Sequence, residues 1–141
     1  MTPKHLLEVS EYDGEGYMPL VDFEAWRVAV LNYTDELLPE RLLTMQRHDE
    51  TDEIFVLLKG HCILFLGNGD EMVGEIYAED LRPFKFYNVK KGCWHTHTLN
   101  KDTAVLIVEN RSTSSENSPT VDLSGAQTSD LVALTRQLWK K

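Results

Sequence analysis

Apolar residues in this chain fall into short segments between turn residues, and this pattern predicts a protein built mainly from β-strands. Residues 25–33, AWRVAVLNY, alternate as a half-buried strand does, with Trp26, Val28 and Val30 on one face. Residues 54–58, IFVLL, are apolar on both faces. Such a strand needs cover on its outer side, which we expect from the N-terminal strand and the C-terminal helix or from a second subunit.

The other apolar segments predict further strands, which bring the expected total to seven or eight. Gly60 separates the 54–58 run from a second apolar run at 62–66, and the two are expected to form a hairpin. The segment 40–48, ERLLTMQRH, fits both the helical and the strand period. More strands are expected within 72–78, 84–89 and 95–110.

The length of the chain, 141 residues, is that of one domain. We expect a barrel core at about 24–110, a polar loop at 111–127 and a C-terminal helix at 128–141. Thr128 or Ser129 can cap the first turn of that helix. The whole chain is therefore predicted to form a single all-β domain followed by one helix.

Charge and composition disfavour several classes of partner. The 14 Lys and Arg residues stand against 23 Asp and Glu, and the net charge of -9 argues against nucleic acid and membranes as partners. The sequence has neither an apolar leader nor a run of about 18 apolar residues, which predicts a cytoplasmic protein. Cys62 and Cys93 are too few for a disulfide framework and are expected to remain thiols.

Polar residues with metal-binding side chains lie next to the two strongest strand segments. Gln46 and His48 are two residues apart and share one face of a strand, while Glu53 follows His48 after a short acidic turn. His95 opens a later strand, and His97 lies two residues further along the same face. This spacing allows the five side chains to converge on one pocket.

These two stretches resemble the paired motifs of the cupin superfamily. The first cupin motif is G-x5-H-x-H-x3,4-E-x6-G, and its second histidine and its glutamate match His48 and Glu53. The second motif is G-x5-P-x-G-x2-H-x3-N, and its inner glycine and its histidine match Gly92 and His95. The departures are Gln46 in place of the first histidine, Lys90 in place of the proline and Leu99 in place of the asparagine.

The resemblance implies an all-β fold, the cupin double-stranded β-helix or jelly-roll barrel, with a C-terminal α-helix. It also implies that His48, Glu53 and His95 bind a divalent metal, with Gln46 as a weak fourth ligand. Two histidines and one carboxylate suit Fe, Zn, Mn or Ni and leave positions open for water or substrate. His97 is the candidate catalytic residue, as a further imidazole or a proton donor or acceptor, and a structural histidine is the alternative.

Three functions remain open from the sequence. The first is a metal-dependent isomerase, lyase or oxygenase that acts on a small oxygenated metabolite. The second is a non-catalytic cupin that binds or senses a small molecule. The third is a metal-independent lyase, because YNVKKGCWHTH at 87–97 also resembles a segment of ureidoglycolate lyases. In each case we expect a small-molecule ligand in the pocket and a homodimer.

Overall fold

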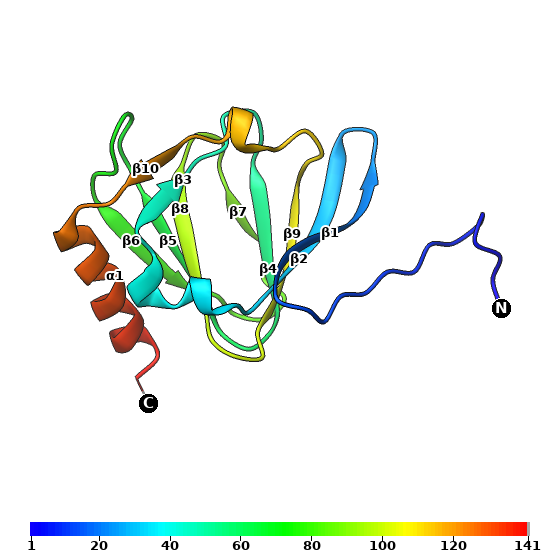
Figure 1. The fold of residues 1–141 in the computed structure, drawn as a ribbon, viewed down its shortest axis with the longest axis horizontal. Coiled ribbons are helices and arrows are strands. Elements are labelled where there is room, and N and C mark those ends of the chain that lie inside the picture. The colour runs from blue at the N-terminus through cyan, green and yellow to red at the C-terminus, as the bar shows by residue number, and fades with distance from the viewer. Residues whose placement is uncertain (141) are drawn as a thin grey trace.

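Two antiparallel sheets of five strands face each other in the computed structural model, which describes residues 1–140 (Figure 1). Sheet A has the strand order β1-β2-β9-β4-β7, and sheet B has the order β10-β3-β8-β5-β6. The strands are β1 (Gly16–Phe23), β2 (Trp26–Asn32), β3 (Thr44–Gln46), β4 (Glu53–Lys59), β5 (Cys62–Gly67), β6 (Ile76–Asp80), β7 (Tyr87–Val89), β8 (Trp94–Leu99), β9 (Ala104–Asn110) and β10 (Thr120–Asp122). The predicted all-β jelly-roll fold with a C-terminal helix is confirmed.

The inward side chains of both sheets fill the space between them. In sheet A the strand register sets Ala29, Ile107 and Phe55 in one row across β2, β9 and β4, and all three are buried. Successive strand residues point to opposite faces, so the next inward row lies two residues further along each strand. Toward one end of the barrel, that next row is Arg27, Glu109 and Glu53. The apolar core therefore ends at a row of charged side chains.

The apolar runs at 54–58 and 62–66 do not form the predicted hairpin. Strand β4 pairs with β7 and β9 in sheet A, whereas β5 pairs with β6 and β8 in sheet B. Gly60, which joins them, has a φ of +84°, and a Cβ there would lie 2.6 Å from the Cα of Thr103. The chain thus turns sharply from one sheet to the other. Because both runs are apolar on both faces, each suits an inner position with a neighbouring strand on either side.

Helix α1 (Gly125–Leu138) begins at Gly125 rather than at residue 128. Ser124 caps it in a capping box with Gln127, so the expected caps, Thr128 and Ser129, lie inside the helix. The helix packs on the outer face of sheet B (Figure 1). Within residues 1–140, no helix has the length and apolar character needed to cross a membrane.

Short elements lie on both sides of the barrel strands. The segment 111–127 contains the 3-10 helix η3 (Ser115–Asn117) and strand β10, which pairs with β3. Two further 3-10 turns, η1 (Asp35–Leu37) and η2 (Pro39–Arg41), precede β3. With β1 and β10, the two sheets extend beyond 24–110 at both ends of that range.

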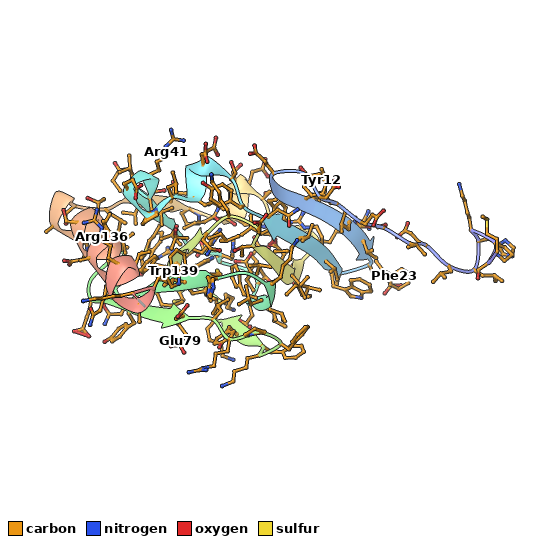
Figure 2. The ribbon with its side chains drawn as sticks, turned by 90° about the horizontal axis from the view of Figure 1, so that it is seen from below. Tyr12, Phe23, Arg41, Glu79, Arg136 and Trp139 are labelled. Atoms are coloured by element: carbon orange, nitrogen blue, oxygen red, sulfur yellow. The ribbon has the colours of Figure 1, made fainter. Side chains whose placement is uncertain are left out.

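The outer face of sheet A is apolar, and helix α1 does not cover it because α1 lies on sheet B. The expected cover of the 54–58 strand by the C-terminal helix is therefore wrong, and the strand at Trp26–Asn32 pairs within sheet A instead of covering it. Residues before Tyr12 extend away from the barrel (Figure 2). Cover by a second subunit stays a prediction. The apolar residues of this face are Val28, Val30, Ile54, Val56, Leu106 and Val108.

Candidate metal centre

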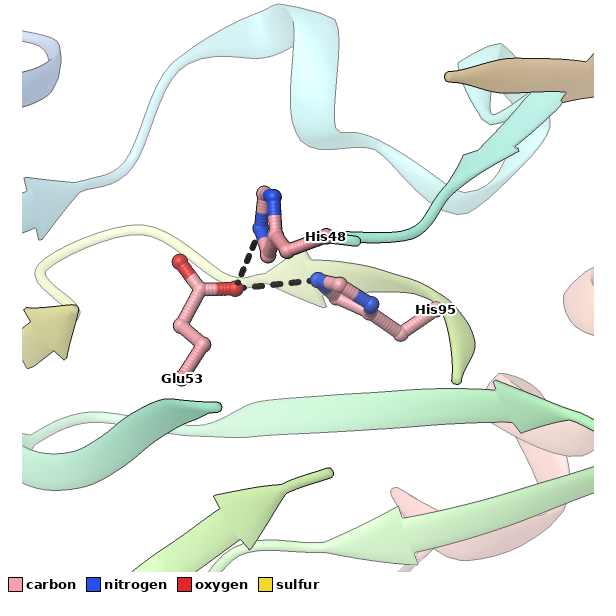
Figure 3. Close-up of side chains that lie close together, drawn as sticks. All are labelled: His48, Glu53 and His95. Carbon is pink, nitrogen blue, oxygen red and sulfur yellow. Dashed lines mark hydrogen bonds and ion pairs between the residues drawn. The ribbon is translucent and has the colours of Figure 1, made fainter. Parts of the chain in front are cut away.

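Three buried side chains from the two sheets converge at the polar end of the barrel (Figure 3). His48 follows β3, Glu53 is the first residue of β4, and His95 lies in β8. One ligand atom from each of the three lies within 4.8 Å of the others. None of the three residues is more than 6% exposed. The structure thus brings together the three residues that the cupin motifs single out.

Local backbone geometry positions the two histidines. The backbone N–H of Gly92 donates to the carbonyl of His48 at 2.8 Å, and the φ of Gly92, +82°, suits glycine. Gln46 pairs with His95 in the register of sheet B, so the segment before His48 runs beside β8. Glu53 reaches the same point from sheet A, where it begins β4 on the inward face.

Both imidazoles direct Nε2 at the same carboxylate oxygen. The Oε1 atom of Glu53 lies 3.1 Å from Nε2 of His48 and 2.9 Å from Nε2 of His95. The opposite ring nitrogens are also held, because Nδ1 of His48 lies 2.7 Å from Oγ of Ser118 and Nδ1 of His95 donates to the carbonyl of Cys93 at 3.0 Å. A carbonyl oxygen only accepts, so the proton of a neutral His95 ring belongs on Nδ1 and its Nε2 presents a lone pair.

A lone pair on Nε2 and a carboxylate oxygen repel each other unless a positive charge lies between them. Burial alone would raise the pKa of Glu53, but hydrogen bonds from His48 and His95 lower it to about 2. Burial likewise opposes a charged His48, yet the Glu53 carboxylate outweighs it and raises the pKa of His48. The cluster therefore contains an ionised carboxylate that favours protonation of His48.

A divalent cation could supply the positive charge between the imidazole Nε2 atoms and the Glu53 oxygen. Two imidazole nitrogens and one carboxylate oxygen are a donor set for Fe, Zn, Mn or Ni. The separations of 2.9 and 3.1 Å from the Glu53 oxygen match the distance of about 3.0 Å between neighbouring ligands at right angles in an octahedral site with metal bonds of about 2.1 Å. The Nδ1 partners, Ser118 and the Cys93 carbonyl, fix both rings from outside, as groups around metal-binding histidines usually do.

Two other predicted site residues line the cavity beside this cluster. Gln46 is the register partner of His95 and is half-buried. His97 lies at the next inward position of β8, with its ring centroid 5.7 Å from that of Phe55. Its Nδ1 is buried without a partner in residues 1–140, and burial lowers the pKa of His97 to about 4. His97 is therefore neutral near neutral pH, and the roles of both residues stay predictions.

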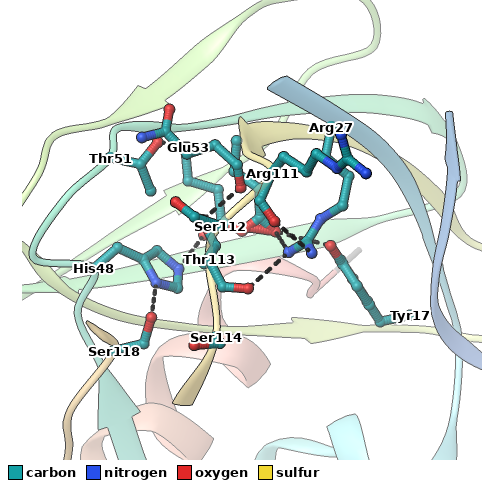
Figure 4. A network of polar contacts seen from close by, with 12 residues as sticks. Tyr17, Arg27, His48, Thr51, Glu53, Arg111, Ser112, Thr113, Ser114 and Ser118 are labelled. Atoms are coloured by element: carbon teal, nitrogen blue, oxygen red, sulfur yellow. Dashed lines mark hydrogen bonds and ion pairs between the residues drawn. The ribbon is translucent and has the colours of Figure 1, made fainter. Parts of the chain in front are cut away.

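Sequence reasoning missed a second polar cluster on the wall of the same cavity (Figure 4). The Oε1 atom of Glu109 accepts from the Tyr17 hydroxyl at 2.8 Å and from Arg27 at 3.1 Å. Burial and then the Glu109 carboxylate raise the pKa of Tyr17 above its usual range. The sequence carried a partial signal in Glu109, which follows the apolar run 104–108, whereas alternation placed Arg27 on the face opposite Val28 and so away from the core.

One cavity of about 540 Å³ connects the two clusters and opens to solvent. His48, Glu53 and His95 line it together with Arg27 and Glu109. A cavity of this size suits a small metabolite, and its few convergent polar groups would fix the orientation of such a ligand.

The comparisons with known proteins show the fold of the chain. No protein family and no curated protein matches it by sequence. Among solved structures, Pac13 from Streptomyces, a nucleoside dehydratase seen with uridine, aligns with a TM-score of 0.56 at 8% identity, over 82% of this chain and 86% of that chain. A cupin-2 domain protein from Shewanella frigidimarina aligns with a TM-score of 0.50 at 16% identity, over 71% of this chain and 85% of that chain. CapF aligns with a TM-score of 0.53 at 11% identity, over 80% of this chain and 34% of that chain.

The chain therefore has the fold of the cupin superfamily, which confirms the prediction from its two degenerate motifs. These identities are low, so the likeness concerns the arrangement of the strands. Function has to be argued from the site itself.

Proposed function

We propose that this chain is a metal-dependent cupin enzyme, of isomerase, lyase or oxygenase type, that acts on a small oxygenated metabolite. His48, Glu53 and His95 are the proposed metal ligands, with Gln46 as a weak fourth. One observation carries the proposal: both Nε2 atoms converge on one oxygen of Glu53, while both Nδ1 atoms have partners outside the cluster. Imidazoles held in this way are already oriented as ligands.

A bound divalent metal would polarise a carbonyl or hydroxyl oxygen of the substrate as a Lewis acid. The residues of the chain bind and orient the substrate. The cavity of about 540 Å³ limits the substrate to a small molecule and confines it beside Glu53. His97 stays neutral near neutral pH because burial lowers its pKa to about 4, so its imidazole can donate or accept a hydrogen bond with a substrate in the cavity.

Elemental analysis of protein purified without chelator or affinity metal tests this proposal. The native chain should hold about one metal ion, and a His48→Ala/His95→Ala double variant should hold none. A His5→Ala/His61→Ala variant is the matched control, because it also loses two imidazoles but both are exposed. Thermal unfolding shows whether each variant is folded. If the native chain binds none of Fe(II), Zn, Mn or Ni after incubation with each, the proposal fails.

Gln46 stands where the cupin motif has a histidine, and this replacement favours a second candidate function that needs no metal. An amide oxygen is a weaker ligand for these ions than a histidine nitrogen, so the site would bind metal less tightly than a cupin with three histidines. A chain that binds no metal would be a metal-independent lyase, as the resemblance of 87–97 to ureidoglycolate lyases implies, or a non-catalytic ligand-binding or sensing cupin. Turnover of ureidoglycolate by the metal-free protein separates these two.

We also propose that the chain forms a homodimer through the outer face of sheet A. The rows Val30–Leu106–Val56 and Val28–Val108–Ile54 carry no charged side chain, although the chain has a net charge of -9. Two copies of an acidic chain can meet at a neutral, apolar face without charge repulsion, and sheets pack well face to face.

Light scattering after size-exclusion chromatography measures the oligomeric state. The native chain should have twice the mass of one copy. Val30→Glu should give a folded monomer, because a charge in the buried face is costly. Met72→Glu, in an exposed loop, is the control and should stay a dimer. A monomeric native chain, or a folded Val30→Glu dimer, contradicts the proposal.

A further inference from the structure

Glu109 has one carboxylate oxygen with two partners and one with none. Its Oε1 accepts hydrogen bonds from Tyr17 and Arg27, whereas its Oε2 is buried and has no partner within residues 1–140. The residue is only 6% exposed. A buried carboxylate oxygen without a hydrogen bond is unfavourable, so a donor on a ligand in the cavity would stabilise it.

Glu109 lies beside the proposed metal ligands on the same wall of the cavity. Ile54 pairs with Val108 in the register of sheet A, so Glu53 and Glu109, one residue further along each strand, are cross-strand neighbours on the inward face. Such neighbours have Cβ atoms about 5 Å apart. Both residues line the cavity of about 540 Å³. A small ligand held next to Glu53 is therefore within reach of Glu109.

Arg27 forms an ion pair with Glu109 at 3.1 Å and uses both terminal nitrogens within the chain. One terminal nitrogen donates to the carbonyl of Arg111 at 3.4 Å, and the other donates to the carbonyl of Thr113 at 3.3 Å and to Glu109 at 3.1 Å (Figure 4). The remaining nitrogen, Nε, is buried and, like Oε2 of Glu109, has no partner within residues 1–140. Both oxygens of a carboxylate that is paired with a guanidinium accept hydrogen bonds, so Oε2 is an acceptor.

We propose that Glu109 is a substrate-binding residue whose Oε2 accepts a hydrogen bond from a hydroxyl group of the substrate. The inference rests on the proposed function, because the metal site is what holds the ligand next to Glu53. Because Glu53 and Glu109 are cross-strand neighbours, this hydroxyl lies near the oxygen of the substrate that would bind the metal. The substrate class is therefore a small hydroxylated carbonyl compound, such as a hydroxy acid or a sugar.

The variant Glu109→Gln reverses the hydrogen-bonding character of this position. Tyr17 and Arg27 both donate at the position of Oε1, so the carbonyl oxygen of the introduced amide has to occupy it and the amide NH2 takes the position of Oε2. An acceptor thereby becomes a donor with almost no change in shape. Glu36→Gln is the matched control, because Glu36 lines the same cavity at an exposed position.

The probes are glycolate and methoxyacetate, which have the same charge and differ because only glycolate has a hydroxyl proton. Broadening of their NMR lines by Mn(II)-loaded protein measures binding at the metal without any need for turnover. The native chain and Glu36→Gln should prefer glycolate by about tenfold or more, as expected for a hydrogen bond to a charged group. Glu109→Gln should lose this preference or reverse it.

The outcomes separate the two proposals. If Mn(II) loads and Glu109→Gln keeps the native preference for glycolate, the difference between the probes is one of size and the role of Glu109 is refuted. If the native chain itself has no preference, the role is refuted as well. If the native chain retains none of Fe(II), Zn, Mn and Ni, the proposed metal function fails, and the role of Glu109 fails with it.

Discussion

Two buried carboxylates, Glu53 and Glu109, lie side by side on neighbouring strands, and each receives two hydrogen bonds at a single oxygen. The partners of Glu53 are two imidazoles, which can lose a proton near neutral pH. The partners of Glu109 are Arg27 and Tyr17, whose protons are not released in that range. Similar burial and similar strand positions therefore lead to different chemistry. The Glu53 cluster can exchange an imidazole proton for a metal ion, whereas Glu109 is held in an ion pair with Arg27.

The largest effect is expected when Arg27 is replaced. Arg27→Met leaves the buried charge of Glu109 with Tyr17 as its one remaining donor, and this should lower the free energy of unfolding by about 3 kcal/mol. Urea denaturation measures the change. Arg82→Met, at an exposed position, is the control and should change stability very little. Equal stability of the two variants would show that Glu109 does not depend on Arg27.

The two carboxylates should differ most clearly in their effect on metal affinity. Glu53→Gln removes a proposed ligand and should weaken metal binding by about 100-fold or more, whereas Glu109→Gln removes the same charge from the next strand and should leave affinity nearly unchanged. Competition with a chelator of known affinity gives both values. Similar losses in the two variants would mean that negative charge in the cavity, and not ligation by Glu53, holds the metal.

The pH dependence of metal binding follows from the competition between a proton and a metal ion for the His48 imidazole. Glu53 raises the pKa of His48, so below this raised pKa a metal ion has to displace a proton from the imidazole. Affinity should therefore fall by about tenfold per pH unit below the pKa of His48, for one displaced proton, and be constant above it. A chelator competition series from about pH 5 to 9 covers this range. A flat profile would show that His48 is not a ligand.

The sequence predicted the Glu53 cluster and missed the Glu109 cluster for a physical reason. His48 and Glu53 lie five residues apart on either side of a turn, so a local motif defines them. Tyr17, Arg27 and Glu109 come from three strands, β1, β2 and β9, that meet through pairing in sheet A. Their proximity depends on a register that the amino-acid pattern does not specify without the structure, although a charged residue at an inward position was a usable signal.

The errors in the sequence-based prediction of the fold have the same origin, because they too concern which strands pair. The hairpin prediction for 54–58 and 62–66 assumed that consecutive strands pair, but in this barrel they belong to opposite sheets. Apolar alternation predicts that a strand exists, but it does not predict the partner strand. It also gave the wrong inward face for 26–32, where Ala29 and Leu31 are in the core and Trp26, Val28 and Val30 face outward. The start of α1 was readable, because Ser124 and Gln127 form a capping-box pair in the sequence three residues apart. Local signals were thus sufficient for helix ends and not for sheet order.

The smallest effect is expected at Ser118, which acts on the metal through His48. Its Oγ lies 2.7 Å from Nδ1 of His48 and donates to Oδ1 of Asn117 at 3.3 Å, so Ser118 accepts from the imidazole and leaves Nε2 free to bind metal. Ser118→Ala should weaken metal binding by about tenfold, and Ser118→Thr should restore most of the loss. Ser115→Ala, at an exposed position of the same cavity, should have no effect. If Ser118→Ala binds metal as the native chain does, the orientation of His48 comes from Glu53 alone, and the two carboxylate clusters differ in their first partners only.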